Sequence, residues 1–318
     1  MITLSEEKVA AVFTHAEALA AAERAFRALD AGKVEMPPRG EVRIPSHSGT
    51  QLTMPCYIHD ELGEALTVKI VSVFENNGTR GLPVIQAFLQ LQDPETGVLL
   101  ALMEAEHLTA MRTAAASVLS TKLFANPSPK SILVVGLGRQ ARTHILAMAD
   151  AFPGLRIHVC DKKPARAIEF CAKFAEFVKS PLIPVERPSD CLAEVSVVCL
   201  ATNSREPVLL GDEVRPGLHV TAIGSFRPDM AEFDCNLIVR ARVYVDQLGA
   251  AQKGAGELIQ AASHEVWSWN DIAGELGGVL NSKVRGRTSS DQITVFKSVG
   301  LAVQDATAAA SVYRIVSA

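Results

Sequence analysis

Residues 131–144 read SILVVGLGRQARTH, an apolar run followed by closely spaced glycines. After Ser131 the run ILVV is continuously apolar rather than alternating, which predicts a parallel strand buried on both faces. Gly136, Gly138 and Ala141 follow in the G-x-G-x-x-A spacing, and the next residues, RQARTHILAMADAF, predict a helix. A strand, a glycine turn and a helix in this order predict a dinucleotide-binding unit.

The residue types in this loop suit a pyrophosphate. The first glycine permits a tight turn, the second lets phosphates approach the backbone, and the alanine lets the helix pack closely on the strand. The start of the helix offers N–H groups and the positive end of its dipole. A plain turn without a ligand is the alternative. The predicted coenzyme-binding residues here are Gly136, Gly138, Arg139, Gln140 and Ala141.

Two later segments bear on the choice of coenzyme. The strand RIHVCD ends at Asp161, where a carboxylate accepts hydrogen bonds from ribose hydroxyls and repels a 2′-phosphate. This slightly favours NAD(H) over NADP(H), although the neighbouring Lys162 could meet a 2′-phosphate. The stretch LATNS at 200–204 ends another strand on small polar residues, so we expect Ala201 and Thr202 near the nicotinamide ribose.

Strand-like and helical segments alternate around this motif. Further apolar strands are SVVCL, HVTAIGS and ARVYVDQ, with helices or turns between them. This alternation of strands and helices predicts an α/β domain of the Rossmann type over residues 119–294, with a doubly wound parallel sheet. The connector ANPSPK precedes it and indicates a domain boundary.

The rest of the chain predicts a different domain, α+β, formed by residues 1–118 with 295–318. Residues 6–32 indicate one amphipathic helix ended at Gly32. Residues 41–103 contain five strand-like segments separated by turns, which predict an antiparallel or mixed sheet. A helix over 106–124 follows, and residues 293–317 predict another long helix that returns to this domain.

Composition excludes several classes of function. The chain has 318 residues, 48% of them hydrophobic, and a net charge of −4 without a basic cluster, so a nucleic-acid partner is not expected. We expect no membrane partner, because no apolar run approaches the ~18 residues of a spanning helix. The N-terminus lacks signal-peptide features, and the six cysteines lack CxxC spacing, which predicts reduced thiols and a cytoplasmic location. No histidine has metal-ligand spacing, so no metal is expected.

Three cations need explanation. Arg112 lies in EHLTAMRTAAASVLSTKLF with no acidic residue three or four positions away, so its anion must come from elsewhere, either protein or ligand. Lys69 lies in the nearly apolar ALTVKIVSVF, where a lysine is at an edge, reaches to water, or is buried for a purpose. Arg43, in EVRIPSHSG, is by itself typical of a surface strand.

Five stretches in order resemble one family: VKIVSVFENNGTRGLP, LTAMRTAAAS, VVGLGRQA, HVTAIGSFRPDMAEF and TVFKSVGLAVQD. Together, from about residue 35 onward, they resemble the ornithine cyclodeaminase/mu-crystallin family. The resemblance implies a homodimer whose first domain binds substrate and dimerises. It implies that Arg43, Lys69 and Arg112 hold the substrate carboxylate, and that Arg112, Thr113 and Ser298 lie near the coenzyme.

Departures from the family pattern narrow the reaction. Cyclodeaminases and related alanine dehydrogenases carry an aspartate where this chain has Phe226, and cyclodeaminases a glutamate where it has Leu52. SFRPDMAEF resembles instead the ketimine reductases, which reduce Δ1-pyrroline-2-carboxylate to L-proline or Δ1-piperideine-2-carboxylate to L-pipecolate. Lys69 is then the candidate proton donor. Alternatives are an alanine dehydrogenase, an ornithine cyclodeaminase, or a non-catalytic NAD(P)H-dependent binding protein.

Overall fold

The computed structural model describes residues 1–318, and the chain separates into two units that alternate along the sequence. Unit 1 is Met1–Arg112 with Leu301–Ala318, and unit 2 is Thr113–Gly300. The first boundary therefore falls inside helix α3 (Glu106–Phe124), earlier than the predicted residue 118. The second falls after residue 300 rather than at 295.

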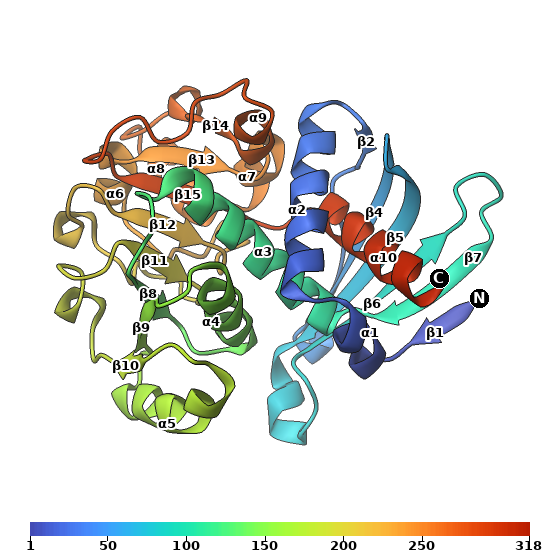
Figure 1. Ribbon diagram of the computed structural model, residues 1–318, viewed down its shortest axis with the longest axis horizontal. Coiled ribbons are helices and arrows are strands. Elements are labelled where there is room, and N and C mark those ends of the chain that lie inside the picture. The colour runs from blue at the N-terminus through green and yellow to red at the C-terminus, as the bar shows by residue number, and fades with distance from the viewer. The chain divides into compact units, whose positions relative to one another are not determined.

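Unit 2 contains an eight-stranded sheet in which every paired strand is parallel. Its order is β10-β9-β8-β11-β12-β15-β13-β14, so the chain reverses direction across the sheet between β8 and β11 (Figure 1). The predicted doubly wound α/β fold is confirmed. The strands are β8 (Ser131–Val135), β9 (Arg156–Cys160), β10 (Leu182–Pro184), β11 (Val197–Leu200), β12 (His219–Ala222), β13 (Arg242–Val245), β14 (Gly274–Glu275) and β15 (Thr294–Lys297).

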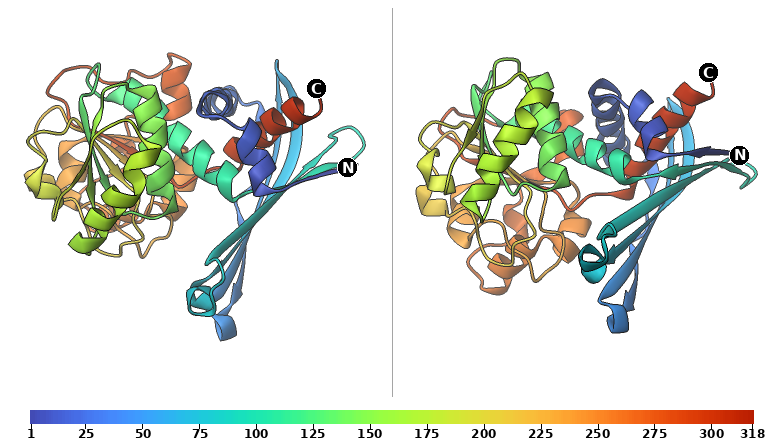
Figure 2. Two further views of the ribbon diagram at one scale, coloured as in Figure 1. Left: turned by 60° about the horizontal axis from the view of Figure 1, so that its bottom comes forward. Right: turned by 90° about the horizontal axis from the view of Figure 1, so that it is seen from below.

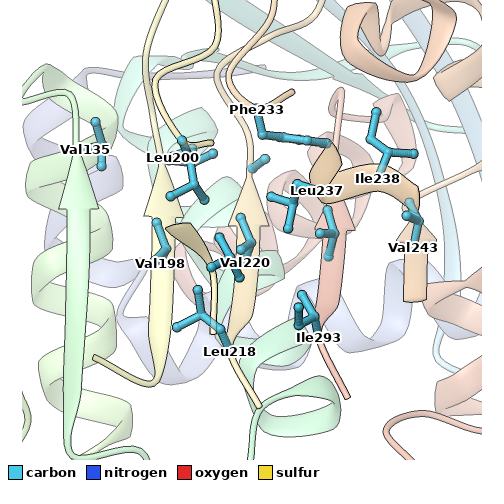
Figure 3. Packing of buried hydrophobic residues seen from close by; sticks show 14 of the residues in the cluster. Val135, Val198, Leu200, Leu218, Val220, Phe233, Leu237, Ile238, Val243 and Ile293 are labelled. Carbon is cyan, nitrogen blue, oxygen red and sulfur yellow. The ribbon is translucent and has the colours of Figure 1, made fainter. Parts of the chain in front are cut away.

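Helices pack on this sheet through apolar side chains. They are α4 (Arg139–Ala151), α5 (Pro164–Phe174), α6 (Cys235–Arg240), α7 (Leu248–Gly254), α8 (Gly256–Ser263) and α9 (Leu276–Leu280). Figure 3 shows Val198, Leu200 and Val220 of adjacent strands beside Leu237 and Ile238 of α6. Burying each such side chain contributes about 1.5–3 kcal/mol, which fixes the positions of the strand ends and of the loops that follow them.

The single helix predicted for residues 293–317 is wrong. Thr294–Lys297 form β15, a central strand between β12 and β13, and α10 (Ala302–Val316) begins only after Gly300, whose φ is +79°. The β-branched and aromatic residues TVF suit a strand buried on both faces. A short apolar run of this kind cannot be told from a buried helix by periodicity alone.

Unit 1 contains a seven-stranded mixed sheet. Its five longest strands are those predicted, and β1 pairs in parallel with β7 while the other pairs are antiparallel. The prediction missed β1 and β2, which have only three and two residues. The strands are β1 (Ile2–Leu4), β2 (Val34–Glu35), β3 (Gly40–Ile44), β4 (Gly49–Asp60), β5 (Gly63–Phe74), β6 (Ile85–Gln92) and β7 (Leu99–Glu104).

Two helices replace the predicted single helix at residues 6–32. These are α1 (Glu6–Val12) and α2 (His15–Asp30). The break occurs because Phe13 turns inward and is fully buried, while the Thr14 hydroxyl accepts a hydrogen bond from the Glu17 N–H at 3.3 Å and caps α2. Both α2 and α10 lie on one face of the sheet, and they contact each other as well as the strands (Figures 1 and 2).

Strand β5 shows how the two faces of this sheet differ. Ala65, Thr67 and Lys69 are buried on the face that meets α10. Leu66, Val68 and Ile70 alternate with them and point to the other face, which no helix of unit 1 covers (Figure 2). Strand pairing adds Phe88, Gln90, Gln92, Leu102 and Glu104 to this second face. We name its apolar members the open face: Leu66, Val68, Ile70, Phe88 and Leu102.

Candidate coenzyme and anion sites

The turn after β8 requires glycine at its first position. Gly136 has φ +88°, and a Cβ there would lie 2.7 Å from the carbonyl oxygen of Ala201. Its N–H donates to the Cys160 carbonyl at 2.9 Å. The turn is therefore pressed between the ends of β9 and β11, where a Rossmann fold binds its ligand.

The start of α4 fits a pyrophosphate. Gly138 is the N-cap residue, no side chain caps the helix, and a Cβ on Gly138 would meet nothing within 4 Å. The Oε1 atom of Gln140 is shielded from solvent and has no hydrogen-bond partner. Ala141 is fully buried and allows the close helix–strand approach that the motif predicts. Open space above a helix N-terminus is what an anionic phosphate group needs.

Asp161 is fixed at the end of β9. The side chain is buried, and its carboxylate accepts hydrogen bonds from the N–H groups of Leu137 at 3.3 Å and Lys163 at 3.2 Å. The guanidinium of Arg166, which is half exposed, pairs with it at 3.2 Å. Lys162 is exposed. The carboxylate therefore has a defined position, and a cation beside it partly offsets its charge.

The loops after β11 and β15 are also held by carboxylates. Thr202 donates from its N–H and its hydroxyl to Glu232 at 2.7 and 2.9 Å. Ser298 is buried, and its hydroxyl donates to Asp246 at 2.8 Å. Thr202 and Ser298 were predicted from the sequence, whereas the two acids that hold them, Glu232 and Asp246, were not. Both predicted residues thus lie at the carboxyl edge of the parallel sheet, in loops with few degrees of freedom.

In unit 1, Lys69 and Arg112 meet at one carboxylate. Asp305 pairs with Lys69 Nζ at 2.7 Å and with Arg112 Nε at 3.0 Å, and all three side chains are buried. Arg112 also donates to Gln304 at 3.3 Å. The anion missing near Arg112 in the sequence is therefore, in part, a protein group 193 positions away. The one signal for Asp305 in the sequence is that it is the single acidic residue of α10 (Ala302–Val316).

The cluster of Lys69, Arg112 and Asp305, here called the cationic cluster, has one positive charge in excess. Burial lowers the pKa of Lys69 to about 8; Arg112 and Arg39 also lower this pKa, and Asp305 opposes them. Such an excess is costly in a buried place unless another anion balances it. Thr67, two residues along the same face, has a buried hydroxyl with no partner. The cluster can therefore accept one small anion.

Arg43 does not join this cluster, contrary to the prediction. Its side chain is 76% exposed and pairs with Glu41 at 2.6 Å. Strand pairing places Arg43 opposite Thr50, and Thr50 opposite Val73. Val73 is four residues from Lys69, or about 13 Å along the strand.

Arg39, and not Arg43, is the arginine of this segment that lies at the level of Lys69. Gly40 pairs with Thr53, so Arg39, one residue earlier, reaches the level of Met54, which pairs with Lys69. Residues opposite each other in an antiparallel pair share a face of the sheet. This explains why Arg39 lowers the pKa of Lys69. The run PPRGEVR contains both arginines, and only strand register distinguishes them.

The chain offers no carboxylate at the position where an amine-binding aspartate was considered. Phe226 is about one third exposed there. Asp229 is half exposed and pairs with Arg205 and Arg227, so it is a surface residue of the turn. Leu52 lies on β4. These residues supply apolar surface rather than a group that binds an ammonium ion or transfers its proton.

Two serines of α3 contact buried histidines of unit 2. Ser117 lies 3.0 Å from His144 Nε2, and Ser120 lies 3.3 Å from His219 Nε2. Burial lowers the pKa of His144 to about 4 and that of His219 to about 3, so both rings are neutral at pH 7. These serines therefore anchor α3 on the unit 2 sheet and are not part of the anion site.

No group of three or more His, Cys, Asp or Glu side chains is placed to hold a metal ion. No helix has both the length and the apolar character that crossing a membrane requires.

The fold, the glycine turn and the cationic cluster define an NAD(P)-dependent oxidoreductase with a Rossmann-type coenzyme domain. The chain belongs to the ornithine cyclodeaminase/mu-crystallin family, whose sequence profile matches residues 1–318. It is 34% identical to mouse ketimine reductase mu-crystallin over 282 residues, which cover 89% of this chain and 85% of the mouse protein.

Two solved structures extend the comparison. Thermococcus litoralis Δ1-pyrroline-2-carboxylate reductase, in complex with NADH and L-proline, has a TM-score of 0.93 and 33% identity, with 99% of this chain and 97% of that one covered. An archaeal alanine dehydrogenase dimer with bound NAD has a TM-score of 0.91 and 30% identity, with 99% and 95% covered.

Proposed function

We propose that the protein reduces a cyclic ketimine carboxylate with NAD(P)H, converting Δ1-pyrroline-2-carboxylate to L-proline or Δ1-piperideine-2-carboxylate to L-pipecolate. The observation that carries the proposal is the buried cationic cluster, which has one positive charge in excess. Similarity to a reductase solved with NADH and L-proline, and to mu-crystallin ketimine reductase, supports the same reaction.

The substrate carboxylate would balance the cationic cluster. The planar guanidinium of Arg112 suits a carboxylate, and the ammonium of Lys69 adds a point charge. Asp305 orients both cations while leaving their combined charge positive. Arg39 replaces Arg43 as the third cation in this proposal, because it lies at the level of Lys69 on the same face of the sheet.

Lys69 is the proposed proton donor. When bound, the reduced nicotinamide supplies the hydride that the C=N carbon accepts, and the ring nitrogen takes one proton. Lys69 can give that proton from Nζ and regain it from water, because its pKa of about 8 lies near the working range. A ketimine already contains its nitrogen, so the lack of an acid at Phe226 is no obstacle. Arg112 and Thr113 remain proposed coenzyme contacts.

NADH is the proposed preferred coenzyme. Asp161 is held by two backbone N–H groups at the end of β9, where its carboxylate would accept hydrogen bonds from ribose hydroxyls. Its charge would repel a 2′-phosphate. Arg166 and Lys162 work in the opposite direction, so NADPH should be accepted less well rather than excluded.

A second copy of this chain is the proposed partner of the open face. Its five apolar side chains lie on three adjacent strands, and Phe88 is 43% exposed. Large exposed apolar patches mark interfaces. The related archaeal alanine dehydrogenase is a dimer. Replacing Val68 with Glu should convert the dimer to monomer in light scattering; an unchanged mass would place the interface elsewhere.

A cytoplasmic location completes the proposal. All six cysteines are free thiols, and four of them are buried. Burial raises the pKa of Cys56 to about 12, which keeps this thiol protonated and unreactive. Free thiols in this number suit a reducing compartment.

The test is oxidation of NADH and of NADPH by the purified protein with each cyclic ketimine, compared with pyruvate plus ammonia. Rapid turnover of a ketimine with pyruvate nearly inert would establish the reductase. Faster pyruvate turnover would establish an alanine dehydrogenase, the second candidate, which the similarity to the archaeal enzyme favours. If neither reacts, ornithine with NAD tests a cyclodeaminase, and coenzyme binding without turnover would indicate a binding protein.

A further inference from the structure

Unit 2 contains a second buried charge cluster that the proposed reaction does not use. It consists of Glu232, Glu257 and Lys297, whose side chains are essentially inaccessible to solvent. The Lys297 ammonium lies 3.4 Å from Glu257 and 3.8 Å from Glu232. We call this group the acidic cluster, because it contains two carboxyl groups and one ammonium group.

Glu232 joins two loops through four hydrogen bonds. Its Oε1 accepts from the Thr202 N–H at 2.7 Å and from the Thr202 hydroxyl at 2.9 Å. Its Oε2 accepts from the N–H groups of Gly224 at 2.8 Å and Ser225 at 3.1 Å. The first loop follows β11 and the second follows β12, so a single carboxylate fixes the distance between them.

The other two members hold Glu232 in place. Glu257 accepts from the Glu232 N–H at 2.9 Å and from the Ser225 hydroxyl at 2.8 Å. Lys297 is the last residue of β15, the next strand in the sheet. The acidic cluster therefore ties the carboxyl ends of three adjacent parallel strands together.

The two loops are also packed without spare room. A Cβ at Gly224 would lie 2.0 Å from the Thr202 carbonyl oxygen. Buried charges are a poor way to gain stability, since apolar residues of similar volume often serve as well. In this buried network the carboxylate oxygens accept hydrogen bonds from N–H and O–H groups of the loops. Such a network is suited to holding the loops in one conformation.

The position of these loops points to the coenzyme. In an open α/β sheet the ligand lies beyond the carboxyl ends of the strands at the switch point, here between β8 and β11. Asp161 at the end of β9 marks the adenosine side. The loops after β11 and β12 then lie on the nicotinamide side.

We propose that Glu232 is the positioning residue for the nicotinamide half of the coenzyme, acting through the loops of Thr202 and Gly224. The proposal rests on the Rossmann geometry of unit 2 and not on the identity of the substrate. It would survive if the reaction proved to be that of an alanine dehydrogenase.

The test is Glu232→Gln, with the dissociation constants of NADH and ADP measured by calorimetry on the full chain. A glutamine keeps one acceptor oxygen, so its NH2 group must face the donors of one loop and release that loop. ADP shares the adenosine and both phosphates with NADH but lacks the nicotinamide half. We expect NADH to bind about tenfold more weakly, a loss of about 1.4 kcal/mol, and ADP to bind within about twofold of wild type.

Glu275→Gln is the matched control, because Glu275 also accepts a backbone N–H, that of Leu248 at 2.7 Å, in a different part of unit 2. It should leave the NADH-to-ADP ratio unchanged. Equal weakening of NADH and ADP by Glu232→Gln, or no weakening of NADH, would overturn the proposal. Should Glu232→Gln not fold, Ser225→Ala removes one hydrogen bond of the cluster and should weaken NADH alone by about threefold; an unchanged NADH affinity there would equally refute it.

Discussion

The cationic cluster of unit 1 and the acidic cluster of unit 2 are both buried groups of three charged side chains, but cations outnumber carboxylates in the first and carboxylates outnumber cations in the second. One has two cations around Asp305, and the other has two carboxylates around Lys297. In the acidic cluster, Glu232 accepts four hydrogen bonds from its own loops. In the cationic cluster, the excess charge has no protein counterpart among the contacts of Asp305. A closed network holds shape, and an open one can take a ligand.

The largest expected effect comes from Lys69→Met, which asks whether the cationic cluster acts in chemistry as well as in binding. Removing a proton donor should lower kcat for the ketimine by about 10²–10⁴-fold. NADH affinity, measured separately by fluorescence, should stay near wild type. A nearly normal kcat with only a raised KM would restrict Lys69 to binding the carboxylate.

Asp305→Asn makes the cationic cluster wholly positive and should destabilise the protein at pH 7 by about 3–5 kcal/mol, because two buried cations lose their counterion. The pKa of Lys69 should fall below its present value of about 8. Urea unfolding at several pH values measures both effects, with the exposed Asp229→Asn as control. A stability loss as small as that of the control would show that Asp305 is not the counterion.

The sign of the pH dependence follows from the same pKa. Lys69 titrates near 10.5 in the unfolded chain and near 8 in the folded one, so the unfolded state holds more protons between these values. Its effect on stability is therefore unfavourable below about pH 8 and is relieved as the pH rises toward 10.5. In Asp305→Asn this relief should begin at lower pH, so the deficit relative to wild type should shrink in alkaline solution.

Comparing Arg39→Ala with Arg43→Ala tests which of the two arginines acts together with the cationic cluster. Arg39 should matter for the substrate carboxylate, and its removal should raise KM by about tenfold with a smaller change in kcat. Arg43 is exposed and paired with Glu41, so its removal should change KM by less than about twofold. Steady-state kinetics on the two variants compares them directly, and the reverse ranking would restore the assignment made from sequence.

The smallest effect concerns the adenosine side of unit 2, outside the acidic cluster. Arg166→Ala removes the cation beside Asp161 and should increase the preference for NADH over NADPH by about threefold to fivefold. The measurement is kcat/KM with each coenzyme. Lys173→Ala, which removes an exposed cation of the same helix, is the control. A shift toward NADPH would mean that Arg166 serves only to hold Asp161.

Sequence predicted the elements with strong local signals. The glycine turn, the helix over 106–124 and the five long strands of unit 1 are all confirmed, because spacing and alternation specify them locally. The break between helices α1 and α2 at Phe13 and Thr14 was not predicted. Its causes are a buried phenyl ring and a hydroxyl cap, and hydrophobic periodicity contains neither signal. Strand β15 escaped because a four-residue apolar run has no period of its own.

The candidate site residues also divide into those with a local signal in the sequence and those that depend on the fold. Lys69 and Arg112 were singled out because each is unusual in its own segment, and Asp161 because it ends the strand that follows the glycine motif. Arg39 and Arg43 stand four residues apart, and only pairing with β4 separates them. Asp305 and Glu232 act on residues far away in sequence, across 193 positions in one case and 30 in the other. Pairing at that range depends on the fold itself.

The long separation between Arg112 and Asp305 has a consequence for synthesis. A ribosome makes all of Thr113–Gly300 before it makes Asp305, so every strand of the coenzyme unit is available first. Until then Lys69 and Arg112 have no Asp305, and α10 is missing from the face of the sheet that buries them. Domains generally fold as units during synthesis. The coenzyme unit is therefore positioned to mature first, and the anion site to be completed last.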